Sequence, residues 1–174
     1  MNETPQQYTQ RILAHTQDQD PLKIQAATPK KLERLIKAAS PATLRKKPAP
    51  DKWSVAEILA HLADVEIVVG WRIRSILGAP GTEVQAYDQN AWNTSLHYDK
   101  RDPRKDLVQQ RILREANLAL LKTLAPEQWK QFGIHSERGQ ESIQHIAKMI
   151  AGHDLNHIQQ IEKILAAKKK AARA

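Results

Sequence analysis

The stretch AGHDLNHIQQI, residues 151–161, carries two histidines four positions apart inside an apolar helical pattern. From Ile143 to Ile164, isoleucines recur every three or four positions or at multiples of that spacing, which is the signature of one buried helix face. With about 100° per residue, His153 and His157 lie about 20° to either side of the centre of this face. The pattern therefore predicts a helix whose buried face carries both imidazoles.

Two buried histidines on neighbouring turns require an explanation. Residues four apart on a helix are neighbours, so the two rings can bind one metal ion. A buried polar group without a partner is costly, and a shared metal ion removes that cost for both rings. Chance pairs of this spacing also occur on helices. The sequence contains no cysteine, so disulfides and thiolate ligands are excluded, and His, Asp and Glu are left as metal ligands.

A second strong helical pattern begins after Trp53. Ser54 is a good N-cap, and Glu57 stands three residues later, which predicts a capping box. An apolar stripe then continues to about Leu77. His61 lies on the shoulder of this stripe, from which a side chain can lean into the interior.

Helical bundles build metal sites from side chains on facing helices, so His61 can join His153 and His157 around one ion. An interior or boundary histidine that is satisfied by ordinary hydrogen bonds is the alternative for His61. The residues alone leave both interpretations open.

The rest of the chain predicts an all-α fold, a four-helix bundle. Further helices are expected over Pro5–Gln17, from the Asp20-Pro21 cap to about Ala39, from the Asp102-Pro103 cap to Leu124, and over Gln140–Ala167. Whether Pro29 kinks the second of these or divides it stays open. The apolar set expected for the helix after Pro103 is Leu107, Ile112, Leu113, Ala116, Leu120, Leu121 and Leu124.

Segments between these helices lack a sustained period. A long loop, Thr82–Asp102, is expected between the second and third main helices, and 126–139 is expected to be a turn-rich link. No strand pattern is convincing. We expect one domain over 1–174, in which 1–27 form a short helical extension and the basic residues 168–174 form a disordered tail.

Composition narrows the class of protein. Four of the eight net positive charges lie in residues 168–173, so the basic balance does not by itself predict a nucleic-acid partner. No apolar run reaches the length of a membrane span, and no signal peptide opens the chain. These features predict a cytoplasmic protein without a membrane partner.

The segment KWSVAEILAHLADVE, residues 52–66, followed about ninety residues later by the helical HxxxH, resembles the DinB-like superfamily. That superfamily includes YfiT-type metal-dependent hydrolases and bacterial thiol S-transferases. YDQNAW, residues 87–92, resembles the segment after the second helix in YfiT-type members. HSERG, residues 135–139, resembles a turn before the last helix, with Ser136 in place of a proline. The resemblance covers about Pro50 to Leu165.

This resemblance implies a four-helix bundle in which His61, His153 and His157 bind a divalent metal ion, nickel or zinc. It also implies a metal-dependent hydrolase or thiol S-transferase that acts on a small molecule, with a low-molecular-weight thiol as a candidate partner. A stress-related binding protein with a vestigial metal site is the alternative, and a nucleic-acid-associated protein is a weaker one. Homodimers are common among such proteins, although no exposed apolar stripe predicts one here.

Further residues are candidates for roles near the metal. Asp154 is a candidate to orient an imidazole, with a surface acid as its alternative. Trp92 and Tyr98 are candidates to line the mouth of the site, with packing of the long loop as the alternative. His135 is a candidate polar residue near the site but not a ligand, and Glu57 is explained by its capping box.

Overall fold

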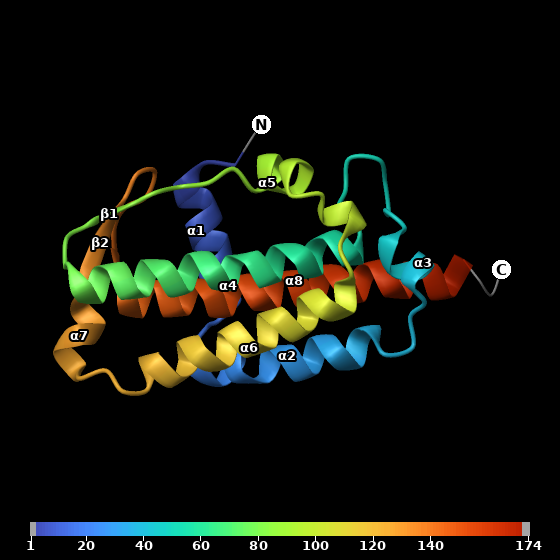
Figure 1. Ribbon diagram of the computed structural model, residues 1–174. Helices are drawn as coiled ribbons and strands as arrows, with labels where there is room; N and C mark the ends of the chain where they lie inside the picture. Colours follow the sequence, from blue (N-terminus) through green and yellow to red (C-terminus); the bar gives the residue numbers. More distant parts are fainter. Residues whose placement is uncertain (1–2, 172–174) are drawn as a thin grey trace.

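The computed structural model describes residues 3–171, with side chains described through residue 167, and shows an elongated helical bundle (Figure 1). Its elements are α1 (Pro5–Ala14), α2 (Pro21–Ile36), α3 (Pro41–Arg45), α4 (Val55–Gly78), β1 (Glu83–Val84), α5 (Gln89–Ser95), the 3-10 helix η1 (Tyr98–Lys100), α6 (Pro103–Leu121), α7 (Pro126–Lys130), β2 (Phe132–His135), β3 (Gly139–Ser142) and α8 (Ile143–Ala171). Among the described residues, no helix combines the length and the apolar character that a bilayer crossing needs.

Four long helices, α2, α4, α6 and α8, form a closed ring (Figure 1). Helix α4 packs against α6 and α8, and α2 packs against the same two helices. Helices α2 and α4 therefore lie diagonally opposite each other, although they are consecutive main helices. Pro29 lies inside α2 without dividing it. The expected four-helix bundle is confirmed.

The connections between the main helices hold more structure than the sequence pattern indicated. The expected long loop contains β1, α5 and η1, and the turn-rich link contains α7 and β2. Strand β1 pairs parallel with β2, which pairs antiparallel with β3. The last helix begins at Ile143 rather than near Gln140, because residues 139–142 form β3. This small sheet lies at one end of the bundle (Figure 1).

The two ends of the chain differ in what the structure describes. The N-terminal segment forms α1, which packs across α8 (Figure 1). Helix α8 continues to Ala171, beyond the expected end at Ala167. The backbone of residues 168–171, expected in the disordered tail, is thus part of α8. Residues 172–174 and the side chains from Lys168 onward lie outside the described part of the chain, so disorder of residues 172–174 stays a prediction.

The bundle core consists of two aliphatic clusters. One includes Leu59, Leu62 and Ile161, and the other includes Val69 and Ile150. On α8, the buried polar residues His153, Asp154 and His157 lie between the two clusters in sequence. They join three buried polar residues of the neighbouring helices in one hydrogen-bonded polar layer: His61 and Glu66 of α4, and Arg114 of α6.

The orientation of α6 differs from the expected one. Of its predicted apolar set, Leu107 and Leu121 are buried, but Ile112 is 56% exposed. The helix instead turns Gln110, Arg114 and Asn117 inward. The side chains of Arg114 and Asn117 pair with the carboxylates of Glu66 and Asp154 inside the bundle, and that pairing outweighs the weak apolar periodicity of this helix. The side-chain amide of Gln110 is buried without a hydrogen-bond partner among the described residues.

Candidate metal centre

His61 is positioned by the regular start of α4. The Ser54 amide donates to Glu57 Oε2 at 2.7 Å, and the Glu57 amide donates to Ser54 Oγ at 3.2 Å. This is the predicted capping box, and it fixes the first turn of α4. Glu57 also forms an ion pair with Lys47 at 3.1 Å. The ring of Trp53 packs edge-on against His61, with 5.1 Å between the ring centroids.

The three predicted histidines converge. His61 Nε2 lies 3.0 Å from His153 Nε2, which lies 3.1 Å from His157 Nε2. All three side chains are buried, and one ring nitrogen from each falls within 4.8 Å of the others. The helical periodicity therefore placed His153 and His157 correctly on the buried face of α8. His61 points inward from the edge of the buried face of α4.

Burial keeps these rings neutral. Loss of solvent lowers the pKa of His61 and His153 well below the ordinary value, and the neighbouring histidines lower it further. Burial also lowers the pKa of His157 to about 4, against the opposing effect of its hydrogen bond with Gln160. Neutral imidazoles are the form that binds a metal ion.

The hydrogen bonds around the rings fit a cation at the centre. His157 Nδ1 lies 3.0 Å from Gln160 Oε1, so this nitrogen carries the proton and Nε2 presents a lone pair to the other two rings. Nδ1 of His61 and of His153 are buried without a hydrogen-bond partner among the described residues. Three Nε2 atoms at these separations match neighbouring ligands of one ion with metal–nitrogen distances of about 2.0–2.1 Å.

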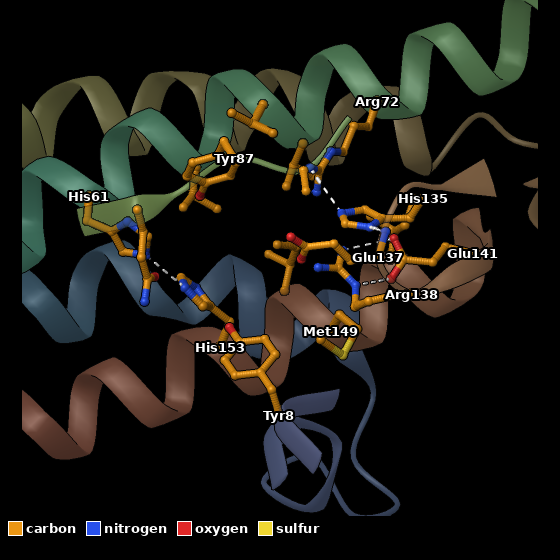
Figure 2. A pocket seen from close by; sticks show the side chains of 17 residues that line it. Tyr8, His61, Arg72, Tyr87, His135, Glu137, Arg138, Glu141, Met149 and His153 are labelled. Atoms are coloured by element: carbon orange, nitrogen blue, oxygen red, sulfur yellow. Dashed lines mark hydrogen bonds and ion pairs between the residues drawn. The ribbon is translucent and has the colours of Figure 1, made fainter. Parts of the chain in front are cut away.

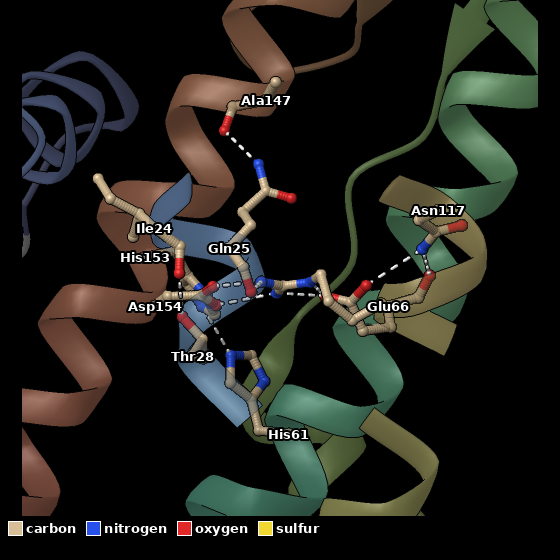
Figure 3. Close-up of polar contacts among 10 residues, drawn as sticks. Ile24, Gln25, Thr28, His61, Glu66, Asn117, Ala147, His153 and Asp154 are labelled. Carbon is tan, nitrogen blue, oxygen red and sulfur yellow. Dashed lines mark hydrogen bonds and ion pairs between the residues drawn. The ribbon is translucent and has the colours of Figure 1, made fainter. Parts of the chain in front are cut away.

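Asp154 does not orient an imidazole through a hydrogen bond, contrary to the expected role. Its two carboxylate oxygens accept from Arg114, with 3.0 Å between Arg114 Nη2 and Oδ1 (Figure 3). Arg114 also donates to Glu66 Oε1 from Nε at 2.8 Å and to the carbonyl of Gln25 at 3.1 Å. The carboxylate beside His153 in sequence thus ties α8 to α6, α4 and α2.

The charges of this network are coupled. Burial lowers the pKa of Arg114, but the neighbouring carboxylates Asp154 and Glu66 outweigh it and raise the pKa above its ordinary value. Burial raises the pKa of Glu66, and Arg114 opposes that shift. Asn117 Nδ2 donates to Glu66 Oε2 at 3.1 Å and completes its coordination. Through Arg114, the network links α4 at Glu66 to α8 at Asp154, the two helices that carry the histidine cluster.

Helix α1 closes one side of the centre, which the sequence did not reveal. It crosses α8 at Gly152, where a Cβ atom would overlap the carbonyl oxygen of Ile12. Glycine permits this close approach of two backbones. Arg11 Nη1 donates to Asn156 Oδ1 at 3.0 Å in the same region, and Tyr8 extends from α1 toward the site (Figure 2).

A cavity of about 110 Å³ opens beside the cluster (Figure 2). His61 and His153 line one end, and polar residues from α4 and the small sheet line the other. Its walls include the following residues: Tyr8, Val65, Val69, Arg72, Tyr87, His135, Arg138, Glu141, Ile146 and Ile150. The cluster is thus accessible to a small molecule.

The other predicted site residues lie at different distances from this cavity. His135 lines it, as expected, although it stands at the end of β2 rather than in a turn. Trp92 does not line it but packs against Tyr87, which does, with 4.4 Å between the ring centroids. Tyr98 is fully buried against Arg101 and is not part of the cavity wall, because η1 directs it into the protein.

Comparisons with known proteins agree with the fold and identify the family. A protein of Bacillus subtilis (strain 168) named "Putative metal-dependent hydrolase YfiT" is 23% identical over 137 residues, covering 78% of this chain and 77% of that protein. A solved structure of YfiT from Bacillus subtilis, described as "a probable metal-dependent hydrolase with an unusual four-helix bundle topology", matches with a TM-score of 0.81. That match covers 97% of this chain and 91% of the other at 20% identity. The DinB superfamily pattern matches residues 26–161, and the chain belongs to this superfamily.

Proposed function

We propose that this member of the DinB superfamily is a metal-dependent enzyme that activates a water, or a low-molecular-weight thiol, for attack on a small electrophile. His61, His153 and His157 would hold one divalent ion through their Nε2 atoms. The observation that carries this proposal is the convergence of three buried, neutral imidazoles, two of which, His61 and His153, line the end of a cavity. Three imidazoles suit nickel and zinc alike.

His61, His153 and His157 would hold the ion with few enough ligands that a water or a thiol could also bind it, and the ion would supply the Lewis acidity that favours loss of their proton near neutral pH. The residues around the cluster fix the positions of its imidazole rings. Gln160 fixes the tautomer and the orientation of His157, and Trp53 packs against His61. The Arg114 network immobilises the turn of α8 that carries His153.

The cavity restricts the substrate. With a volume of about 110 Å³, it accommodates only a small molecule or the reactive end of a larger one. Aliphatic side chains such as Val65, Val69 and Ile150 form part of its wall and limit the number of water molecules beside the reacting group. A confined site of this kind suits attack by one activated nucleophile.

Hydrolysis is the favoured reaction of the two. The support is the relative YfiT, whose name describes a metal-dependent hydrolase. Thiol transfer uses the same cluster and cavity with a thiol in place of water, so it differs in the nucleophile alone. The two reactions are therefore separated by the dependence of turnover on added thiol.

The test measures release of product from a panel of small activated esters and amides by protein loaded with zinc or nickel, with and without a low-molecular-weight thiol. We expect turnover that His157→Ala abolishes while the circular dichroism spectrum is retained. The matched control is His145→Gln, on the same helix but outside the cluster. Turnover that survives His157→Ala would contradict the proposal, as would metal-loaded protein without activity in either nucleophile series.

A further inference from the structure

The two ends of the cavity have different chemistry (Figure 2). His61 and His153 lie at one end. Arg72 of α4 and His135 of β2 lie at the other, with 3.4 Å between Arg72 Nη2 and His135 Nε2. Neither residue is needed to form the three-histidine cluster, so the second end has a function of its own to explain.

Arg72 carries the uncompensated charge at this end. Arg138 also lines the cavity, but Glu141 holds it with two hydrogen bonds of 2.6 and 3.0 Å. Among the described residues, by contrast, no carboxylate forms an ion pair with Arg72. Its Nη2 donates to the carbonyl of Gln85, and the guanidinium lies 6.0 Å from the centre of the Tyr87 ring. Glu137, the other acid of the wall, is exposed and therefore screened by solvent.

His135 presents a second donor beside Arg72. Burial and the charge of Arg138 lower the pKa of His135 to about 4, so the ring is neutral at pH 7 and has one lone pair. Two donors face the ring: the backbone amide of Glu137 lies 3.2 Å from Nδ1, and Arg72 Nη2 lies 3.4 Å from Nε2. We assign the lone pair to Nδ1, because the Glu137 contact is the shorter of the two. Nε2 therefore carries the proton, and two N–H donors, from His135 and from Arg72, lie side by side at the wall.

We propose that Arg72 and His135 form a carboxylate-binding subsite at the end of the cavity opposite the three histidines. A carboxylate offers two oxygens, which match the planar donor array of a guanidinium and leave an acceptor for the imidazole N–H. The substrate class is then a small carboxylic acid derivative whose reacting group reaches the histidine end. This assignment of substrate rests on the proposed function, whereas the anion subsite itself does not require a metal.

The experiment titrates propionate into the full-length, metal-free protein and follows the Nε–H signal of Arg72 and the ring signals of His135 by NMR. We expect both sets of signals to shift, and propanamide, a neutral molecule of the same shape, to leave them in place. Arg72→Met should weaken propionate binding about tenfold or more, because a hydrogen-bonded charge pair is lost. Arg111→Met, at an exposed position of α6, is the matched control and should bind like the wild type.

Two results would overturn the proposal: an Arg72 signal that propionate does not move in the wild type, or equal affinity in Arg72→Met. The first needs no variant, so it holds even if Arg72→Met fails to fold. His153→Ala separates this proposal from the metal centre. Retained propionate binding in His153→Ala supports a distinct subsite, and lost binding would place the anion at the histidines and overturn the assignment. A protein that binds propionate but no metal would refute the proposed function alone.

Discussion

Removal of Arg114 should destabilise the fold strongly. The side chain is 1% exposed and donates five hydrogen bonds, to Glu66, Asp154 and the carbonyl of Gln25. In Arg114→Met, both carboxylates stay buried without their cation. Breaking a buried ion pair by removing one partner costs about 3–5 kcal/mol. For a chain of this length, that corresponds to a fall in Tm of about 6–20 °C.

The assay is urea unfolding of metal-free protein at pH 8 and pH 5, followed by circular dichroism. Because Glu66 already has a raised pKa in the fold, loss of Arg114 raises it further, and protonation then stabilises the variant as the pH falls. The deficit relative to wild type should therefore be smaller at pH 5 than at pH 8. Arg111→Met, exposed on the same helix, should change stability by less than about 0.5 kcal/mol.

A second variant tests the cause of the loss. Adding Glu66→Gln and Asp154→Asn to Arg114→Met removes the stranded charges and should recover part of the lost stability. A loss below about 1 kcal/mol in Arg114→Met would refute the reasoning, since that is what a solvated surface pair contributes. A deficit that grows as the pH falls would refute it equally.

Two further predictions concern the approach of α1 and the protonation of the cavity wall. Gly152→Ala should cost about 1–3 kcal/mol of unfolding free energy, because the added Cβ overlaps the Ile12 carbonyl. Gly78→Ala is the control and should cost nothing, because its Cβ meets no neighbour. Equal effects of the two substitutions in urea unfolding would contradict the close approach of α1 and α8. His135 should titrate by NMR with a pKa of about 4. Because its pKa in the folded protein lies below that in the unfolded chain, this residue should lower stability as the pH falls below about 6.5. A titration midpoint near 6.5 would contradict the burial of His135 beside Arg138.

The long helices α4 and α8 followed from local signals. Each has a strong apolar period, and α4 also has the capping box of Ser54 and Glu57. Both signals act within a few residues, so a single sequence carries them completely. The same periods located His61, His153 and His157 on or beside buried faces, and the resemblance to the DinB-like superfamily implied that the three share one metal ion.

Helix α6 shows where such reasoning fails. Its interior face is chosen by Arg114 and Asn117, whose partner Glu66 lies on another helix. Burial of an arginine depends on partners distant in sequence, and local periodicity cannot report it. One signal was present, because Glu66 falls on the shoulder of the apolar stripe of α4, opposite His61. Polar or charged residues at both edges of the buried face of one helix, here His61 and Glu66, indicate a polar layer in the core.

The small sheet and the cavity were also beyond local signals. Strands β1 and β2 come from different connections and pair with each other. Their segments of two and four residues are too short to show a period of their own. The sheet places His135 beside Arg72, although the two residues are 63 positions apart in the sequence. Likewise, the contact of α1 with α8 depends on Gly152, which no local sequence pattern distinguishes from the other residues of the helix.

The central claim is that His61, His153 and His157 together hold one divalent ion. The most direct measurement is elemental analysis of untagged protein after incubation with zinc or nickel and removal of excess ion, beside His153→Ala and the control His145→Gln. The account predicts about one equivalent of metal in the wild type and in His145→Gln, and none in His153→Ala. Protein that retains no metal, or a His153→Ala variant that retains as much as the wild type, would contradict it.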